Sequence, residues 1–289
     1  MQTSIECVPC FVRQALDAIR FASPDVSVHE RLLRDVLLEV ANMDMMMSPP
    51  RMAQRIHRAV RALTGNADPY AQVKRLFNDL AVKVRDDKRL EIAASDDPLQ
   101  AAVKLAIAGN VIDFGVRADL SPAHLDSAID HAASAELGGD WQALRDAVTA
   151  ARTLLLLADN AGEIAFDVLL VEQMRAKDVT VAVRGAPVIN DATVVDAKQV
   201  GMTAVATVID NGSDAPGTIL EDCSEAFVQR FHESDVVIAK GQGNYETLSE
   251  APREVFFLLK AKCPVIANDI GCEVGSVVVR RGGCTGDTA

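Results

Sequence analysis

Two hydrophobic rhythms divide the chain. Up to about residue 110, apolar side chains recur at the three- and four-residue spacing of amphipathic helices. This pattern predicts helices over residues 6–21, 29–42 and 50–64, a further helix from Asp68 onward, and one over residues 98–109. Asp68-Pro69 favours a helix start, because Asp can cap the first turn and Pro suits it. No strand is expected before about residue 150.

Beyond that point, short aliphatic runs alternate with helical stretches. The runs expected to form strands are residues 153–158, 179–183, 203–209, 235–239, 263–267 and 276–280. Near-continuous apolar runs suit parallel strands that are covered on both faces. The alternation therefore predicts an α/β protein with a three-layer, mostly parallel sheet. We expect an all-helical domain over residues 1–130 and an α/β domain over residues 131–289, with the boundary between residues 116 and 150.

The amino-acid composition argues against nucleic acid and membrane as partners of the protein. The chain has 289 residues, 49% of them hydrophobic, which suffices for one large or two smaller domains. Its net charge of −12 repels phosphate backbones, so nucleic acid is not an expected partner. No apolar stretch reaches the roughly 20 residues of a membrane helix, and the N-terminus lacks the features of a signal peptide. We expect a cytoplasmic protein without membrane contact, and the sequence leaves its oligomeric state open.

Polar residues follow the expected strands. In open α/β sheets, ligands bind beyond the carboxyl ends of the strands. The segments at these ends are residues 159–163, 184–191, 210–212, 240–246 and 268–269. Their carboxylate and amide oxygens are ligands that Mg²⁺ or Mn²⁺ prefers, whereas 5 histidines give little material for a zinc site. Taken alone, Asp159-Asn160 would more often cap a helix and Asp191 would be a turn residue.

Two further features at the strand ends have an ordinary alternative. Lys240 precedes a segment with two glycines, whose backbone N–H groups can approach an anion closely. The order is not that of a Walker loop, and the alternative is a flexible turn. Glu163 and Asp167 lie four residues apart and share a helix face, so that one of them can point into a site. The alternative is that both face solvent near a helix N-terminus, where acids are favoured.

Cys7 and Cys10 form a Cys-x-x-Cys pair near the N-terminus. One pair supplies two of the four ligands that a structural zinc needs, and Cys272 or Cys284 could complete the set. Redox chemistry is less favoured, since the pair does not follow an expected strand. A second metal at Cys7 and Cys10 is therefore one interpretation, and a pair of inert thiols is the more common outcome.

The motifs in this order resemble the damage-control phosphatases, the ARMT-like family long catalogued as domain of unknown function 89. The resemblance is to the archaeal and bacterial branch with an N-terminal Cys pair, and it spans nearly the whole chain. The matching segments are Cys7-Val-Pro-Cys10, Asp68-Pro69-Tyr70 with Lys74 and Asn78, Asn110-Val-Ile-Asp113, Asp159-Asn160-Ala-Gly-Glu163 with Asp167, Asn190-Asp191, Lys240-Gly-Gln-Gly-Asn244 and Ile270-Gly271-Cys272. Each segment is weak alone, but the combination is specific.

The resemblance implies a fold, an activity and a set of site residues. The α/β domain would be Rossmann-like, and the activity would be hydrolysis of small phosphate monoesters such as sugar phosphates or damaged phosphometabolites. A divalent cation (Mn²⁺, Mg²⁺, Co²⁺ or Ni²⁺) would be held by Asp159, Asn160 and Asp191. The carboxylates of Asp159, Asp191 and Glu163 would serve catalysis. The residues implied to bind substrate are Lys240, Gly241, Asn244, Asn110 and Asp113.

Two other functions compete with this interpretation. A carboxyl methyltransferase would need a nucleoside pocket, and the first expected strand is not followed by a Gly-x-Gly-x-x-Gly loop. A non-catalytic protein could bind a metal or a sugar phosphate without turning it over. Within the phosphatase interpretation, the nucleophile is either a metal-activated water or an aspartate. The sequence identifies neither the phosphate ester nor the metal.

Overall fold

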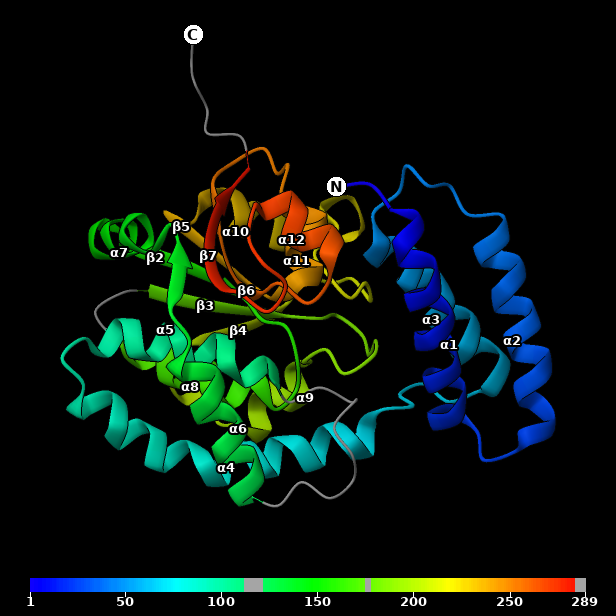
Figure 1. The fold of residues 1–289 in the computed structure, drawn as a ribbon, viewed down its shortest axis with the longest axis horizontal. Coiled ribbons are helices and arrows are strands. Elements are labelled where there is room, and N and C mark those ends of the chain that lie inside the picture. The colour runs from blue at the N-terminus through cyan, green and yellow to red at the C-terminus, as the bar shows by residue number, and fades with distance from the viewer. Residues whose placement is uncertain (112–121, 175–177, 284–289) are drawn as a thin grey trace, which may run out of the picture.

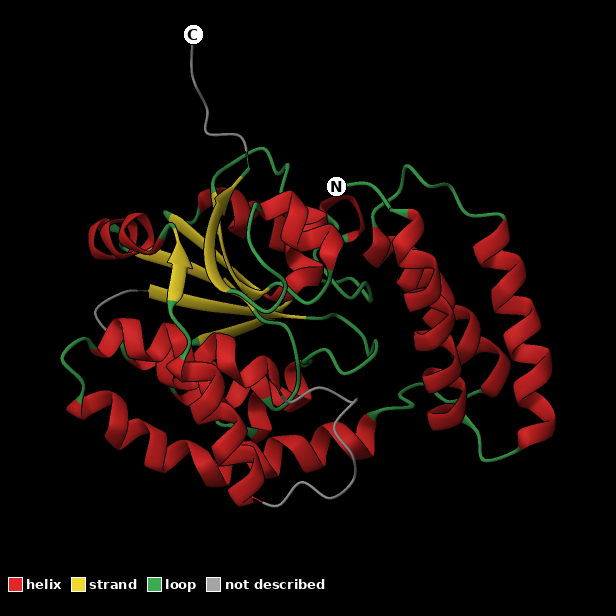
Figure 2. Cartoon of the chain, viewed as in Figure 1, coloured by secondary structure: helices red, strands yellow, loops and turns green. Residues whose placement is uncertain are grey.

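The computed structural model describes residues 1–111, 122–174 and 178–283. N-terminal helices are followed by alternating strands and helices around a seven-stranded, mostly parallel sheet (Figure 1), which confirms the expected α/β class. Figure 2 shows helices on both faces of the sheet and a separate group of helices beside it. No helix within the described residues is long and apolar enough to cross a membrane.

The first helices form a cluster of their own. A short 3-10 turn (Ile5–Cys7) precedes α1 (Val8–Ala22), α2 (Val26–Ala41) and α3 (Pro49–Thr64), which lie on the right of Figure 1. Their shared core contains Phe11, Leu32 and Ile56. Helix α3 begins with two prolines in its first turn and ends at Gly65, whose φ of 69° is the left-handed conformation that stops a helix.

The next helices cover one face of the sheet. They are α4 (Ala71–Ala94), α5 (Pro98–Ala108), α6 (Pro122–Ser134), α7 (Trp141–Ala150), α8 (Glu163–Glu172) and α9 (Val194–Gln199). Their buried side chains share one hydrophobic cluster with the strands. The opposite face is covered by α10 (Glu225–Glu233), α11 (Gly241–Leu248) and α12 (Pro264–Ile270). Helices α4 and α5 thus pack against the sheet, together with helices that come later in the chain. The expected domain boundary at residue 130 stays a prediction.

The sheet order identifies the edge where a ligand should bind. The strands are β1 (Leu137–Gly139), β2 (Thr153–Leu157), β3 (Asp178–Val183), β4 (Thr207–Asp210), β5 (Val236–Lys240), β6 (Val255–Lys260) and β7 (Val277–Gly282), in the order β1-β7-β6-β5-β2-β3-β4. All pairs are parallel except β6 and β7. The chain moves from β2 toward β3 on one side and places β5 on the other, so β2 and β5 flank the topological switch point.

Three expectations about strands were wrong. Strand β1 lies before residue 150, β6 was not foreseen, and residues 263–267 form the cap and first turn of α12. Pro264 starts that helix, and its apolar side chains pack into the core. A short apolar run fits a buried strand and a buried helix equally well, so periodicity alone could not distinguish them. The expected strand over residues 203–209 is reduced to β4, preceded by a 3-10 turn (Met202–Ala204).

Candidate functional site

Backbone hydrogen bonds join the two segments that are predicted to hold a metal, one after β2 and one after β3. Asp159 and Asn160 follow β2, and Asp191 lies in the turn after β3. The Ala192 N–H donates to the Asp159 carbonyl over 2.8 Å, and Asn160 and Asp191 form an isolated antiparallel bridge. The ends of the neighbouring strands β2 and β3 therefore hold Asp159, Asn160 and Asp191 in one place.

Two side-chain amides bridge two carboxylates at this edge. Asn160 Nδ2 donates to Asp159 Oδ2 over 2.8 Å and to Glu163 Oε2 over 3.1 Å. Asn110 Nδ2, from the 3-10 turn Gly109–Val111, donates to the same two oxygens over 3.0 and 2.6 Å. The structure therefore brings Asn110 and Glu163 to the predicted site. Asp113 lies outside the described residues.

Lys240 ends β5 and is enclosed by the protein. Its Nζ donates to Glu163 Oε1 and Asp167 Oδ1, each over 2.6 Å, and to the Ala106 carbonyl over 2.9 Å. Burial lowers the pKa of Lys240, but the two carboxylates outweigh burial and raise it above its ordinary value. All three ammonium donors are used, so a bond to phosphate would replace one of these bonds. The phosphate-binding role of Lys240 stays a prediction.

Arg184 follows β3 and was not among the residues selected from the sequence. Its side chain is buried, and Nε donates to Asp191 Oδ2 over 2.6 Å. Nη1 donates to Thr218 Oγ1 over 3.3 Å and to Asn244 Oδ1 over 3.2 Å. Asn244 also donates to the Lys240 carbonyl, so it joins the ends of two strands, and its predicted contact with substrate is not tested. The signal that could have identified Arg184 is a cation directly after a strand and before a glycine.

The buried charges at this edge do not balance. Besides the buried pair of Lys74 and Asp196, two cations, Lys240 and Arg184, face four buried carboxylates. The four are Asp159, Glu163, Asp167 and Asp191. Two formal negative charges are therefore in excess, since four minus two leaves two. An excess of buried negative charge is unfavourable unless carboxylates are protonated or a cation binds.

The pKa values of the acids reflect this excess. Burial, followed by the charges of Glu163 and Asp191, raises the pKa of Asp159 well above its ordinary value. Burial raises the pKa of Asp167 to about 6 although Lys240 opposes it. Burial also raises the pKa of Asp191 in spite of its bond to Arg184. The site in this form therefore favours additional positive charge.

Three side-chain oxygens at this edge are of the type that hard divalent cations prefer. No described residue donates a hydrogen bond to Oδ1 of Asp159, Asn160 or Asp191, whose other carboxylate or amide atoms are held as described above. Carboxylate and amide oxygens suit Mg²⁺ or Mn²⁺. Within the described ranges, no three His, Cys, Asp or Glu side chains are arranged to hold a metal. The present set has two carboxylates and one amide, so it differs from such a group.

Gly241 lets the end of β5 approach Asp159. Its φ of 78° is left-handed, and a Cβ built on it would lie 1.9 Å from Asp159 Oδ2. The sequence predicted that an anion lies against this glycine. In the structure, the Asp159 carboxylate lies against this glycine, and the contact of Gly241 with substrate stays a prediction.

Changing Gly241 to Ala should displace the Asp159 carboxylate in addition to straining the backbone. A left-handed alanine alone costs about 1 kcal/mol. Gly65→Ala is the matched control, because Gly65 has a φ of 69° with nothing within 4 Å of its Cβ position. We expect similar strain in both variants, but loss of divalent-cation binding only in Gly241→Ala. Unfolding curves and calorimetric Mn²⁺ titrations measure the two effects, and equal Mn²⁺ affinity in both variants would contradict the assignment.

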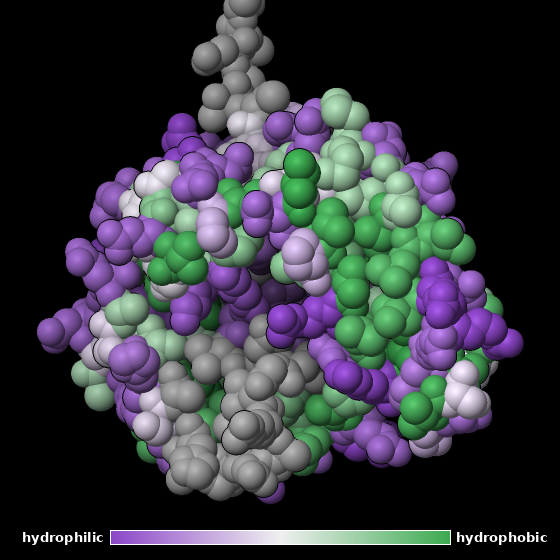
Figure 3. Space-filling view, turned by 45° about the vertical axis from the view of Figure 1, so that its right-hand side comes forward, coloured by the Kyte–Doolittle hydropathy of each residue, from purple (hydrophilic) through white to green (hydrophobic). Residues whose placement is uncertain are grey.

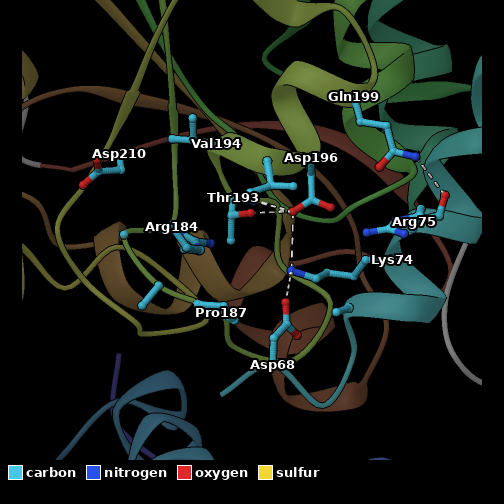
Figure 4. A pocket seen from close by; sticks show the side chains of 14 residues that line it. Asp68, Lys74, Arg75, Arg184, Pro187, Thr193, Val194, Asp196, Gln199 and Asp210 are labelled. Atoms are coloured by element: carbon cyan, nitrogen blue, oxygen red, sulfur yellow. Dashed lines mark hydrogen bonds and ion pairs between the residues drawn. The ribbon is translucent and has the colours of Figure 1, made fainter. Parts of the chain in front are cut away.

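Helix α4 supports the turn after β2 and opens a pocket beside it. Asn78 Oδ1 accepts from the Gly162 N–H over 2.7 Å, and Asn78 Nδ2 donates to Asp196 Oδ1 over 2.9 Å. Lys74 Nζ lies 2.9 Å from Asp68 Oδ2 and 3.4 Å from Asp196 Oδ2 (Figure 4). Asp68, Lys74 and Asp196 border a pocket of about 620 Å³, which Arg184 lines from the side of β3. On the face shown in Figure 3, hydrophilic residues border a hollow in the surface.

The Cys pair lies near a cysteine that was not expected. Cys7 caps α1 and Cys10 lies in its first turn. Burial raises the pKa of the Cys10 thiol, and the neighbouring Cys263 raises it further. Cys284 lies outside the described residues, and no described side chains complete a three-ligand group here. The second metal stays a prediction.

Three comparisons place the chain among known proteins. Residues 3–278 match the Damage-control phosphatase ARMT1-like domain. A damage-control phosphatase of Pyrococcus horikoshii is 35% identical, with 97% of this chain and 98% of the relative covered. A damage-control phosphatase of Archaeoglobus fulgidus is 35% identical over 79% of this chain and 81% of the relative.

The solved structures include a close match in fold. The crystal structure of a DUF89 family protein from Pyrococcus horikoshii has a TM-score of 0.90 and 34% identity, covering 98% of this chain and 99% of that one. The fold, the order of the motifs and the match over nearly the whole length agree. The chain belongs to the damage-control phosphatase ARMT1-like family.

Proposed function

We propose that the protein is a metal-dependent phosphatase that hydrolyses small phosphate monoesters, such as sugar phosphates or damaged phosphometabolites. The observation that carries this proposal is the unbalanced pair of buried negative charges beside three accepting oxygens at the switch point. An isolated pair of this kind would be costly, whereas a divalent cation compensates it. Relatives that share about a third of the sequence are named damage-control phosphatases.

In this proposal, Asp159, Asn160 and Asp191 hold the cation. When bound, it neutralises phosphoryl oxygens and lowers the pKa of a bound water. Glu163 shares both amide donors with Asp159, so it keeps that carboxylate oriented. Lys240 fixes Glu163 from the other side. These fixed hydrogen bonds are the protein's own contribution to an electrostatically pre-organised site.

The reaction transfers a phosphoryl group to water. The bond from phosphorus to the ester oxygen breaks, a bond from phosphorus to water oxygen forms, and a proton passes from water to the departing alkoxide. Transfer is either direct or through an aspartyl-phosphate on one of the site carboxylates. Acid quenching of a single turnover with ³²P-labelled ester decides between the two, since only the second leaves label on the protein.

A metal-by-substrate screen tests the proposal. We expect phosphate release from at least one sugar phosphate in the presence of Mn²⁺, Mg²⁺, Co²⁺ or Ni²⁺, and none after dialysis against a chelator. Activity should return when the metal is restored. Tight binding of a sugar phosphate without any release would instead favour the non-catalytic binding protein. Release that persists without metal would eliminate the metal site as the catalyst.

A further inference from the structure

Arg184 holds an unsatisfied donor beside the pocket. Its side chain is only 2% exposed, and three of its bonds go to Asp191, Thr218 and Asn244. Among the described residues, its Nη2 has no hydrogen-bond partner. A buried charged donor without a hydrogen-bond partner destabilises the protein, and a hydrogen bond to a bound acceptor would remove this penalty.

Other buried polar atoms also lack partners, but their surroundings differ. Examples are His57 Nε2, Arg85 Nε and Asp167 Oδ2. None of these residues lines the 620 Å³ pocket, whereas Arg184 does. Figure 4 shows Arg184 in the pocket wall between Thr193 and Pro187. Arg184 thus lines a cavity that can admit a small molecule, and its unpaired Nη2 is buried in the wall of that cavity.

We propose that Arg184 binds the phosphate group of the ligand through Nη2 while its Nε holds Asp191. This inference rests on the proposed function and assigns the anion contact within the same site. Arginine presents paired donors that match phosphate oxygens, and Asp191, Thr218 and Asn244 already fix its orientation. Lys240, the cation favoured by the sequence, has all its donors committed to protein groups.

The geometry also connects the anion to the metal ligands. Arg184 donates to Oδ2 of Asp191, which leaves Oδ1 of this proposed metal ligand without a bond to Arg184. The same guanidinium therefore positions a metal ligand and supplies a donor to the anion. Because bonds to charged groups are involved, losing the Nη2 contact should weaken phosphate binding by about tenfold to a hundredfold. A lysine at position 184 keeps the charge but cannot present both donors.

Calorimetric titration with inorganic phosphate tests the proposal on Mn²⁺-loaded protein. We expect Arg184→Lys to lose phosphate affinity by about tenfold or more. Its Mn²⁺ affinity, measured by electron paramagnetic resonance of the free ion, should change far less. Arg85→Lys is the control, since Arg85 Nε is also buried without a hydrogen-bond partner among the described residues, but Arg85 does not line the pocket. It should bind phosphate like the parent.

Two results would overturn the inference. One is an unchanged phosphate affinity in Arg184→Lys. The other is an equal loss of phosphate and Mn²⁺ affinity, which would mean that Arg184 acts only by positioning Asp191. If the variant does not fold, a crystal of the parent protein with Mn²⁺ and phosphate decides, because phosphate must then lie within hydrogen-bond distance of Arg184 Nη2. Phosphate binding is measured without turnover, so this test is independent of whether any ester is hydrolysed.

Discussion

Replacing Asp159 with Asn should reduce phosphomonoester turnover by about a hundredfold or more, while the metal-free protein becomes more stable. The amide keeps the shape of the side chain but removes one of the excess negative charges. The pKa of Asp159 is raised in the folded state, so its carboxylate destabilises the metal-free fold once the pH rises above the ordinary aspartate value of about 3.9. The stability gain should therefore be present at neutral pH and shrink in acid.

Thermal melts with and without Mn²⁺, together with turnover measurements, separate these effects. The parent should melt at a higher temperature when Mn²⁺ is added, and Asp159→Asn should show a smaller increase. Asp87→Asn is the charge-matched control, because Asp87 is exposed on α4. Its turnover should equal that of the parent. Turnover near the parent's in Asp159→Asn with metal restored would remove Asp159 from the site.

Replacing Lys240 with Met should destabilise the protein by about 3–5 kcal/mol. Methionine fills a similar volume, but Glu163 and Asp167 would lose their shared ammonium in a fully buried position. The double variant Lys240→Met with Asp167→Asn should recover part of this loss, since one unpaired carboxylate is removed. Urea unfolding of the parent, both single variants and the double variant gives the coupling energy.

Lys88→Met is the matched control for this experiment. Lys88 is also buried, at 3% exposure, but its partners Glu91, Asp126 and Asp130 are at least 46% exposed. These acids can return to water when the lysine is removed, so the expected loss is about 1 kcal/mol or less. A loss in Lys240→Met as small as in Lys88→Met would show that the carboxylates near Lys240 are not ionised in the folded protein.

The parts of the fold that depend on long periodic segments could be predicted from sequence. The helical spacing of residues 6–64 and the aliphatic runs that became β2, β3 and β5 indicated the α/β class. Because parallel strands end at one edge, Asp159, Asp191 and Lys240 could be expected to lie together. The order of β1, β6 and β7 could not be foreseen, since short apolar runs do not specify their partners.

The charge pairing at the site could not be predicted in the same way. Glu163 and Asp167 lie near a helix start, where acids usually meet solvent, but α8 is buried along its length and turns both toward Lys240. Because acids at a helix start usually meet solvent, Lys240 was expected to be free to bind phosphate. The position of Arg184 after a strand was visible in the sequence, but its unpaired nitrogen is a property of packing that residue types do not reveal.

Anomalous X-ray scattering from a crystal of the protein soaked in Mn²⁺ tests the central claim most directly. We expect one strong Mn²⁺ peak beyond the ends of β2 and β3, within roughly 2.0–2.6 Å of oxygens from Asp159, Asn160 and Asp191. The peak should disappear in crystals of Asp159→Asn. A Mn²⁺ peak elsewhere, with no density at these three oxygens in an enzyme that is active with Mn²⁺, would contradict the account.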